Sequence, residues 1–156
     1  MAAPETVLGS GPDNGPDTGP LTLHATTVAF DGQGVLIRGA SGAGKSALGL
    51  QLMALGAVLV ADDQTVLHRQ GDQLIATCPP GLTGLIEARG IGLLNAPWVA
   101  QAVLRLVVDL DRLEAARLPD WHQTGLLGRS LSLVLRSESA HFPAAIRHYV
   151  LYGRRG

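Results

Sequence analysis

The single lysine of this chain, Lys45, lies in a glycine-rich segment whose residue types and spacing could bind phosphate. Lysine and arginine together number twelve, so the other eleven are arginines. A compact ammonium reaches the β- and γ-phosphates of a nucleotide more readily than a planar guanidinium does. The segment matches the pattern G-x-x-x-x-G-K-[ST], in which successive backbone N–H groups wrap the phosphates. The residues predicted to bind a nucleotide are Gly39, Ala40, Ser41, Gly42, Ala43, Gly44, Lys45 and Ser46.

The residues on either side of this segment predict the setting that the motif requires. Residues 34–38 form a short apolar run typical of a buried strand, and residues 46–55 predict a helix that ends at Gly56. The helix would add its positive N-terminal end, and the Ser46 hydroxyl would be placed to bind Mg²⁺. The alternative is a glycine- and serine-rich turn that carries Lys-Ser by chance, and the flanking strand and helix disfavour it. We therefore predict a binding site for a nucleoside triphosphate.

Two adjacent carboxylates, Asp62 and Asp63, follow the apolar run 58–61 and could do acid–base chemistry. One of them could hold Mg²⁺ through water, while the other takes a proton from an attacking hydroxyl or water. Which of the two is the base stays open, and a solvated turn between two strands is the alternative. Asp109, which follows Val107 and Val108, competes for the same acidic role.

A second charged pair, Glu87 and Arg89, would lie on one face of an extended chain. The carboxylate could serve a metal ion and the guanidinium a phosphate, although a surface ion pair on a strand is the simpler interpretation. His24 stands in the middle of a predicted strand, where a histidine is more often structural than catalytic. The remaining histidines show no spacing typical of a metal site.

Composition favours one globular domain and excludes several classes of partner. The chain has 156 residues, 46% hydrophobic residues and a net charge of −1. This charge gives no electrostatic reason to expect nucleic-acid binding, and no apolar run is long enough to predict a membrane span. The one cysteine, Cys78, cannot form an internal disulfide, which fits a reducing, cytoplasmic location.

Residues 1–20 differ from the rest because prolines and glycines recur through them. They contain no basic residue and no apolar stretch of the kind found in signal peptides. We expect a disordered Pro/Gly-rich tail over residues 1–20, followed by a catalytic domain over residues 21–156.

The remaining patterns predict an α/β fold with a mixed β-sheet in a single P-loop domain. A terminal helix is expected over residues 142–152, begun by Pro143. Hairpin turns are expected at residues 31–32 and 70–72. Strands are expected at residues 21–30, 34–38, 57–61, 65–68, 73–77, 85–90, 103–110 and 131–135.

The order of these motifs resembles the catalytic domain of HPr kinase/phosphorylase. His24 is followed by the glycine-rich loop, then by the strand that ends at Asp62 and Asp63, and then by Glu-Ala-Arg-Gly-Ile-Gly over residues 87–92. The last segment is much more specific than the loop alone, and the resemblance spans residues 21–135. It implies an HPr kinase/PEP carboxykinase-like fold. It also implies an ATP- and Mg²⁺-dependent protein serine kinase that acts on an HPr-type phosphocarrier and so regulates a phosphotransferase system.

The resemblance also implies a role for individual residues. Asp63 is similar to the acid/base residue, and Lys45 to the ligand of the γ-phosphate. Ser46 and Glu87 resemble the Mg²⁺ ligands, with Asp62 and Arg89 beside the nucleotide. His24 resembles the active-site histidine, and Arg117 aligns with a catalytic arginine, though the region before it is shorter here.

Two departures from the family pattern shape our expectations. The N-terminal domain of longer members is replaced by the Pro/Gly tail, so we expect a truncated form. Residues 136–139, Arg-Ser-Glu-Ser, stand where longer members carry a basic loop, so we expect weak or absent phosphorylase activity and leave homo-oligomer formation open. The competing functions are a P-loop kinase for a small metabolite and a non-enzymatic nucleotide-binding switch.

Overall fold

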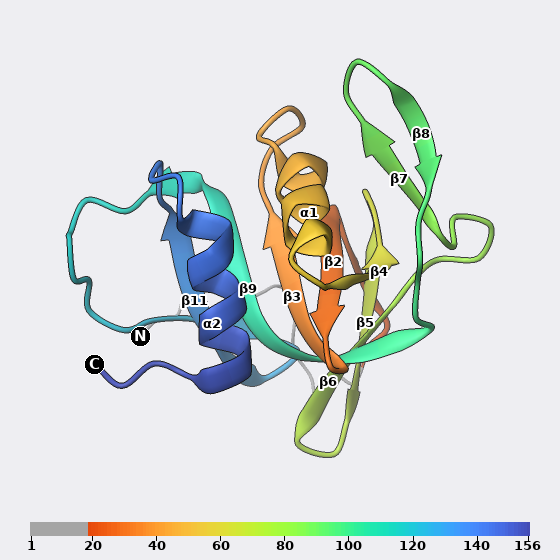
Figure 1. Cartoon of the computed structure of the whole chain (residues 1–156). Coiled ribbons are helices and arrows are strands. Elements are labelled where there is room, and N and C mark those ends of the chain that lie inside the picture. The colour runs from red at the N-terminus through yellow and green to blue at the C-terminus, as the bar shows by residue number, and fades with distance from the viewer. Residues whose placement is uncertain (1–18) are drawn as a thin grey trace.

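The structure is a computed structural model that describes residues 19–156. The tail expected over residues 1–20 lies outside the described residues, apart from Gly19 and Pro20. A strongly curled mixed sheet forms the body, and two helices lie on one of its faces (Figure 1). Its strands are β1 (Leu21–Leu23), β2 (Ala25–Phe30), β3 (Gln33–Arg38), β4 (Val58–Ala61), β5 (Thr65–Gln70), β6 (Gln73–Thr77), β9 (Gln101–Leu113), β10 (His122–Leu126) and β11 (Arg129–Arg136).

One hairpin and two helices complete the described fold. A separate hairpin of β7 (Leu85–Ala88) and β8 (Gly92–Asn95) stands beside the main sheet (Figure 1). The helices are α1 (Lys45–Ala54) and α2 (Phe142–Tyr152). No helix within residues 19–156 has the length and apolar content needed to cross a membrane.

The directions of the strands gather four chain segments at one edge of the sheet. β3 and β11 both run parallel to β9, while β2 is antiparallel to β3 and to β4. Strands β3, β4, β9 and β11 therefore all end at the same edge, where β2 begins. This edge of a parallel arrangement is where ligands usually bind in α/β folds. It carries the glycine-rich loop, the aspartate pair, His24 and the segment after β9.

The core is built from alternating side chains along the central strands, with one shift of register in β9 between Leu104 and Leu106. Val35 and Ile37 of β3 pack with α1 and α2, whereas Leu36 points to a second cluster on the opposite face. Leu106 and Val108 of β9 join the helical side in the same way, and Val107 joins the other. Burial on both faces explains why these strands read as continuous apolar runs.

Most expected elements are present, including both helices, both hairpin turns and the mixed sheet. The single strand expected over residues 21–30 is wrong. It is two strands, because β1 pairs with β5 whereas β2 pairs with β3 and β4, and His24 stands at the change of partner. Strands β8 and β10 were not predicted, since their residues are rich in glycine and polar side chains. β9 is also longer than expected at both ends.

Candidate active site

The glycine-rich loop holds Lys45 in place with its own backbone. The Lys45 Nζ donates to the carbonyl oxygens of Gly39 at 2.8 Å and Ala40 at 3.0 Å, and the residue is only 7% exposed. An ammonium has three N–H donors, so the third is available to a phosphate oxygen. At the other end of the loop Gly44 caps α1 with a φ of 102°, a conformation that glycine adopts without strain.

Asp62 ties the loop to the sheet. Its Oδ1 accepts hydrogen bonds from the hydroxyls of Ser46 and Thr26, both at 2.7 Å, and its Oδ2 accepts the N–H of Glu87 at 2.9 Å. The carboxylate is buried and its two oxygens have three donors. Because the Ser46 hydroxyl donates its hydrogen bond to Asp62, the lone pairs of the Ser46 oxygen remain available to a cation.

Asp63 occupies the opposite environment from its neighbour. The Gln64 N–H donates to the Asp62 carbonyl at 2.7 Å, which makes a tight turn with Asp63 at its centre and a φ of 68°. Aspartate tolerates this left-handed region better than most residues. The turn projects the Asp63 carboxylate into solvent, where its Oδ1 lies 2.7 Å from Nε2 of His24. The two side chains are 68% and 55% exposed.

Two adjoining clefts bring most of the predicted residues together. A cleft of about 510 Å³ is lined by loop residues, by His24 and Asp63, and by Glu87 and Arg89. A second cleft of about 660 Å³ also reaches Asp63, Glu87 and Arg89, and it includes Asp62. Both volumes lie in the range of small-molecule sites, roughly 300–1,000 Å³. Within residues 19–156 no ion pair joins Glu87 to Arg89, so the surface ion pair suggested as an alternative is not formed.

Asp109 and Arg117 lie outside the lining of these clefts, as do the loop residues Gly39, Ala40 and Ala43. Asp109 is buried, and its carboxylate lies 3.5 Å from Nη2 of Arg38 and 3.4 Å from Nε of Arg112. Arg117 is exposed in the segment between β9 and β10. Sequence reasoning missed Thr26, whose fully buried hydroxyl in an apolar strand signals a polar partner.

Comparison with known proteins places this fold and this cleft in a family. The family model described as "HPr Serine kinase C-terminal domain" matches residues 19–118, which is more than half of the chain. The chain belongs to the HPr serine kinase C-terminal domain family. The match covers every element that lines the two clefts and ends just after Arg117.

Individual members of this family and their structures agree with that assignment. The HPr kinase/phosphorylase of Burkholderia lata is 38% identical over 148 residues, which cover 83% of this chain and 46% of the relative. The protein of the same name from Cupriavidus metallidurans is 38% identical over 149 residues, or 84% of this chain and 46% of the relative. The chain thus spans about half the length of these curated relatives. The structure of the Hpr(Ser) kinase/phosphatase from Coxiella burnetii matches with a TM-score of 0.71 and 29% identity, covering 83% of this chain and 88% of that one.

Proposed function

We propose that this chain is the catalytic domain of an ATP- and Mg²⁺-dependent protein serine kinase that phosphorylates an HPr-type phosphocarrier. The observation that carries the proposal is the cleft that Lys45 shares with the Asp63–His24 pair. It sets a phosphate-binding cation and an accessible proton acceptor in one space, as transfer to a hydroxyl requires. Family membership supports an HPr-type acceptor, and with these reactants we infer a cytoplasmic location.

The residues present fit a nucleotide with Mg²⁺. Ser46 and Glu87 would hold the cation, and Asp62 would fix the Ser46 hydroxyl through the 2.7 Å hydrogen bond. Among residues 19–156 no cluster of three or more His, Cys, Asp or Glu side chains could hold a metal. This suits Mg²⁺, which keeps several waters and binds substrate phosphates with one or two carboxylates. When bound, the ion supplies positive charge that offsets charge developing on the transferred phosphoryl group.

The chain's own residues account for the proton and the phosphate. Asp63 takes the proton of the acceptor serine at its exposed carboxylate, and His24, 2.7 Å away, orients that carboxylate. Lys45 directs its remaining N–H to the γ-phosphate, and the backbone N–H groups of the loop hold the other phosphates. Arg89 lines the cleft beside them, and Arg117 would act from the segment that follows β9.

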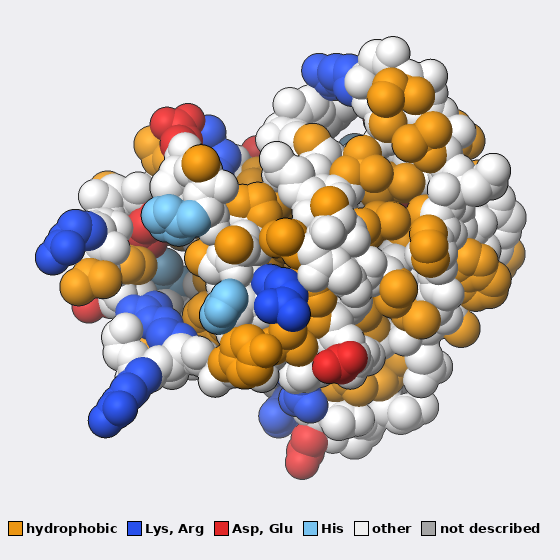
Figure 2. Space-filling view, viewed as in Figure 1, with side chains coloured by type: hydrophobic (Ala, Val, Ile, Leu, Met, Phe, Trp, Pro, Cys, Tyr) orange, Lys and Arg blue, Asp and Glu red, His pale blue; other side chains and the backbone are white. Residues whose placement is uncertain are grey.

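A protein acceptor fits the surroundings of Asp63 better than a small metabolite does. The hairpin that flanks the larger cleft exposes Ile91 and Leu93, which are 79% and 65% exposed, and Leu82 lies beside them. Figure 2 shows hydrophobic side chains gathered over this part of the molecule. Apolar side chains on the rim of a reaction site favour contact with another protein surface. The alternative of a nucleotide-binding switch leaves the Asp63–His24 pair without a use.

The deciding experiment incubates the chain with labelled ATP, Mg²⁺ and a purified HPr-type carrier. We expect the wild type to label the carrier on serine, and Asp63→Asn to lower the rate on the order of 10²–10⁴-fold because the base is lost. Asparagine also tolerates the left-handed turn, so the fold should survive. The matched control is Asp31→Asn, because Asp31 has a φ of 51° in the β2–β3 turn, away from both clefts.

Lys45→Ala should abolish the transfer, since the γ-phosphate loses its cationic partner. An unlabelled carrier alongside steady phosphorylation of a small hydroxyl compound would instead support the metabolite kinase. Full activity of Asp63→Asn, with loss of activity in Asp109→Asn, would show that the wrong aspartate has been assigned.

A further inference from the structure

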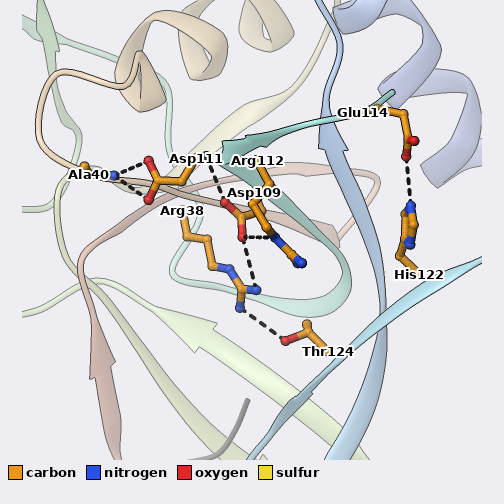
Figure 3. Close-up of polar contacts among 8 residues, drawn as sticks. All are labelled: Arg38, Ala40, Asp109, Asp111, Arg112, Glu114, His122 and Thr124. Atoms are coloured by element: carbon orange, nitrogen blue, oxygen red, sulfur yellow. Dashed lines mark hydrogen bonds and ion pairs between the residues drawn. The ribbon is translucent and has the colours of Figure 1, made fainter. Parts of the chain in front are cut away.

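The loop that holds Lys45 is itself held from outside by a carboxylate on β9. Asp111 accepts the N–H of Ala40 with both oxygens, at 2.9 Å for Oδ1 and 3.1 Å for Oδ2 (Figure 3). This carboxylate lies outside the lining of both clefts, and the proposed phosphoryl transfer does not use it directly.

The Ala40 N–H belongs to the same peptide group as the Gly39 carbonyl, which accepts the Lys45 ammonium at 2.8 Å. In a planar trans peptide the N–H and the C=O point in opposite directions. The carboxylate of Asp111 therefore lies on one side of this peptide group and the ammonium of Lys45 on the other. Both charges favour the same orientation of the peptide dipole. The hydrogen bonds to Asp111 therefore keep the Gly39 carbonyl directed at Lys45, and the bond to Lys45 keeps the Ala40 N–H directed at Asp111.

The register of the sheet explains why Asp111 reaches this peptide. Arg38, the last residue of β3, pairs with Asp109 of β9, and β9 continues to Leu113. Two residues beyond that pair, Ala40 on the loop lies opposite Asp111. The close approach also needs Gly39, because a Cβ there would lie 3.3 Å from Cβ of Leu110 and 3.1 Å from Cβ of Ala43.

The backbone of Asp111 is fixed in turn by a buried carboxylate. The Asp111 N–H donates to Oδ1 of Asp109 at 2.9 Å, and the other oxygen of Asp109 faces Arg38 and Arg112 (Figure 3). Asp109 is only 8% exposed, so its position is set by the core. The backbone of Asp111 is thus anchored in the end of β9, and its exposed side chain is held by the two hydrogen bonds from the Ala40 N–H.

We propose that Asp111 is a positioning residue that orients the Gly39–Ala40 peptide and, through it, the ammonium of Lys45. The inference rests on the proposed nucleotide site and deepens it, because it adds a residue that never touches phosphate to the phosphate-binding apparatus. Removing the carboxylate frees the peptide to rotate. Lys45 then loses a carbonyl partner and its defined direction toward the phosphates.

The test uses the fact that Lys45 is the only lysine in the chain. Protein labelled with ¹³C at lysine Cε gives one lysine signal by NMR, and that signal reports Lys45 alone. We expect Asp111→Ala to move this signal in the free protein and to weaken ATP binding about tenfold, as loss of a charged hydrogen bond would. Asp111→Asn keeps one oxygen acceptor for the Ala40 N–H, so its signal and its affinity should recover toward wild type.

The control is Asp72→Ala, which removes the same charge from the β5–β6 turn, where the Asp72 side chain is 91% exposed. An Asp111→Ala signal that coincides with this control, with ATP affinity within about twofold of it, would overturn the inference. If Asp111→Ala fails to fold, Asp111→Val, which also removes both acceptor oxygens, takes its place, and a signal that coincides with the Asp72→Ala control is equally decisive against the inference. A wild-type signal that ignores ATP would refute the nucleotide site, while the free-state comparison would still test the link from Asp111 to Lys45.

Discussion

Asp62 and Asp63 are adjacent in sequence, yet the turn between β4 and β5 gives them different chemistry. Asp62 is buried and accepts three hydrogen bonds, so most of its lone pairs are already used within the fold. Asp63 is exposed, and the one side-chain partner found for it in the described part of the chain is His24. An accessible carboxylate can approach a substrate hydroxyl more readily than a buried one that already accepts three hydrogen bonds. The geometry therefore favours Asp63 as the base and Asp62 as the organiser of the metal side.

A substitution at Glu87 tests the proposal that this residue is a Mg²⁺ ligand. Replacing Glu87 with Gln substitutes a neutral amide for a carboxylate. An amide is a poorer ligand than a carboxylate for a hard cation such as Mg²⁺. We expect the Mg²⁺ concentration for half-maximal phosphorylation of the carrier to rise on the order of tenfold, the lower end of what losing a supporting group costs. A titration of activity against Mg²⁺ measures this directly.

The backbone N–H of Glu87, which Asp62 accepts, is unchanged in this variant, so the fold of β7 should persist. Asp72→Asn provides the charge-matched control, and it should follow the wild-type titration curve. A Glu87→Gln curve that overlays both would leave Glu87 as a cleft-lining residue without a metal role.

Residue patterns alone predicted the loop and offered Asp63 and Glu87 as candidates, because each belongs to a compact motif or follows a recognisable strand. His24 became a candidate only through the family resemblance. Thr26 and Asp111 could not be predicted in the same way. Their roles depend on contacts with Asp62 and Ala40, which are 36 and 71 residues away in the sequence. Such contacts follow from strand register, which a single sequence does not reveal.

At the scale of elements, the segment that carries Arg117 is fastened at both of its ends. Glu114 accepts the N–H of Ala116 at 3.1 Å and lies 2.8 Å from Nε2 of His122 at the start of β10. Near the other end, Arg154 after α2 donates to the Pro119 carbonyl and lies 4.3 Å from the ring centroid of Trp121. These contacts tie the segment to β10 and to the chain after α2, and Arg117 lies between them.

The contacts of the Glu114 carboxylate should make the melting temperature depend on pH. The Ala116 N–H is the largest influence that lowers the pKa of Glu114, and His122 lowers it further. A lowered carboxyl pKa stabilises the fold above the ordinary pKa of glutamate, and this contribution is lost as the pH falls through the lowered value. We expect Glu114→Gln to reduce the melting temperature by about 2 °C at pH 7.

Because glutamine resembles the protonated carboxyl, the difference from wild type should shrink as the pH falls below the usual pKa of glutamate, roughly 4, and vanish below the lowered pKa of Glu114. Melting curves of both proteins at several pH values measure it, and Glu138→Gln, at a more exposed carboxylate, serves for comparison. A difference that stays constant down to pH 3 would mean that the Glu114 charge contributes nothing.

Element prediction succeeded where local signals were strong. Pro143 lies in the first turn of α2, which begins at Phe142, and Gly56 follows α1, as expected for helix ends. Element prediction failed for β8 and β10. Each is held in an extended conformation by pairing, β8 with β7 and β10 with β11, and its own residues do not indicate a strand. The break at His24 was missed for a related reason, since a change of pairing partner leaves no mark on the alternation of residues.

At the scale of the molecule, the parallel course of β9 and β11 brings residues 137–141 to the edge that bears the clefts. This segment contributes little free positive charge. Arg136 Nη1 lies 2.9 Å from Oε2 of Glu138, and the Ser139 hydroxyl lies 3.3 Å from that of Ser137 and 3.1 Å from Nε2 of His141. Apart from the buried Nε of Arg136, which has no hydrogen-bond partner among residues 19–156, these polar groups bind one another, which disfavours a second anion beside the nucleotide site.

This charge balance predicts a kinase with little phosphorylase activity. In phosphorolysis an oxygen of inorganic phosphate attacks the phosphoserine phosphorus, the serine oxygen departs and takes a proton, and pyrophosphate forms. Two anions must then share one site, which requires several cationic donors, whereas Arg136 is already paired with Glu138. We expect serine-phosphorylated carrier with excess phosphate to release pyrophosphate at less than about a hundredth of the forward rate, a barrier difference of roughly 3 kcal/mol. The Burkholderia lata HPr kinase/phosphorylase, run in parallel, shows that the assay detects the reaction, and brisk pyrophosphate release by this chain would mean that another cation, Arg117 or Arg129, completes the site.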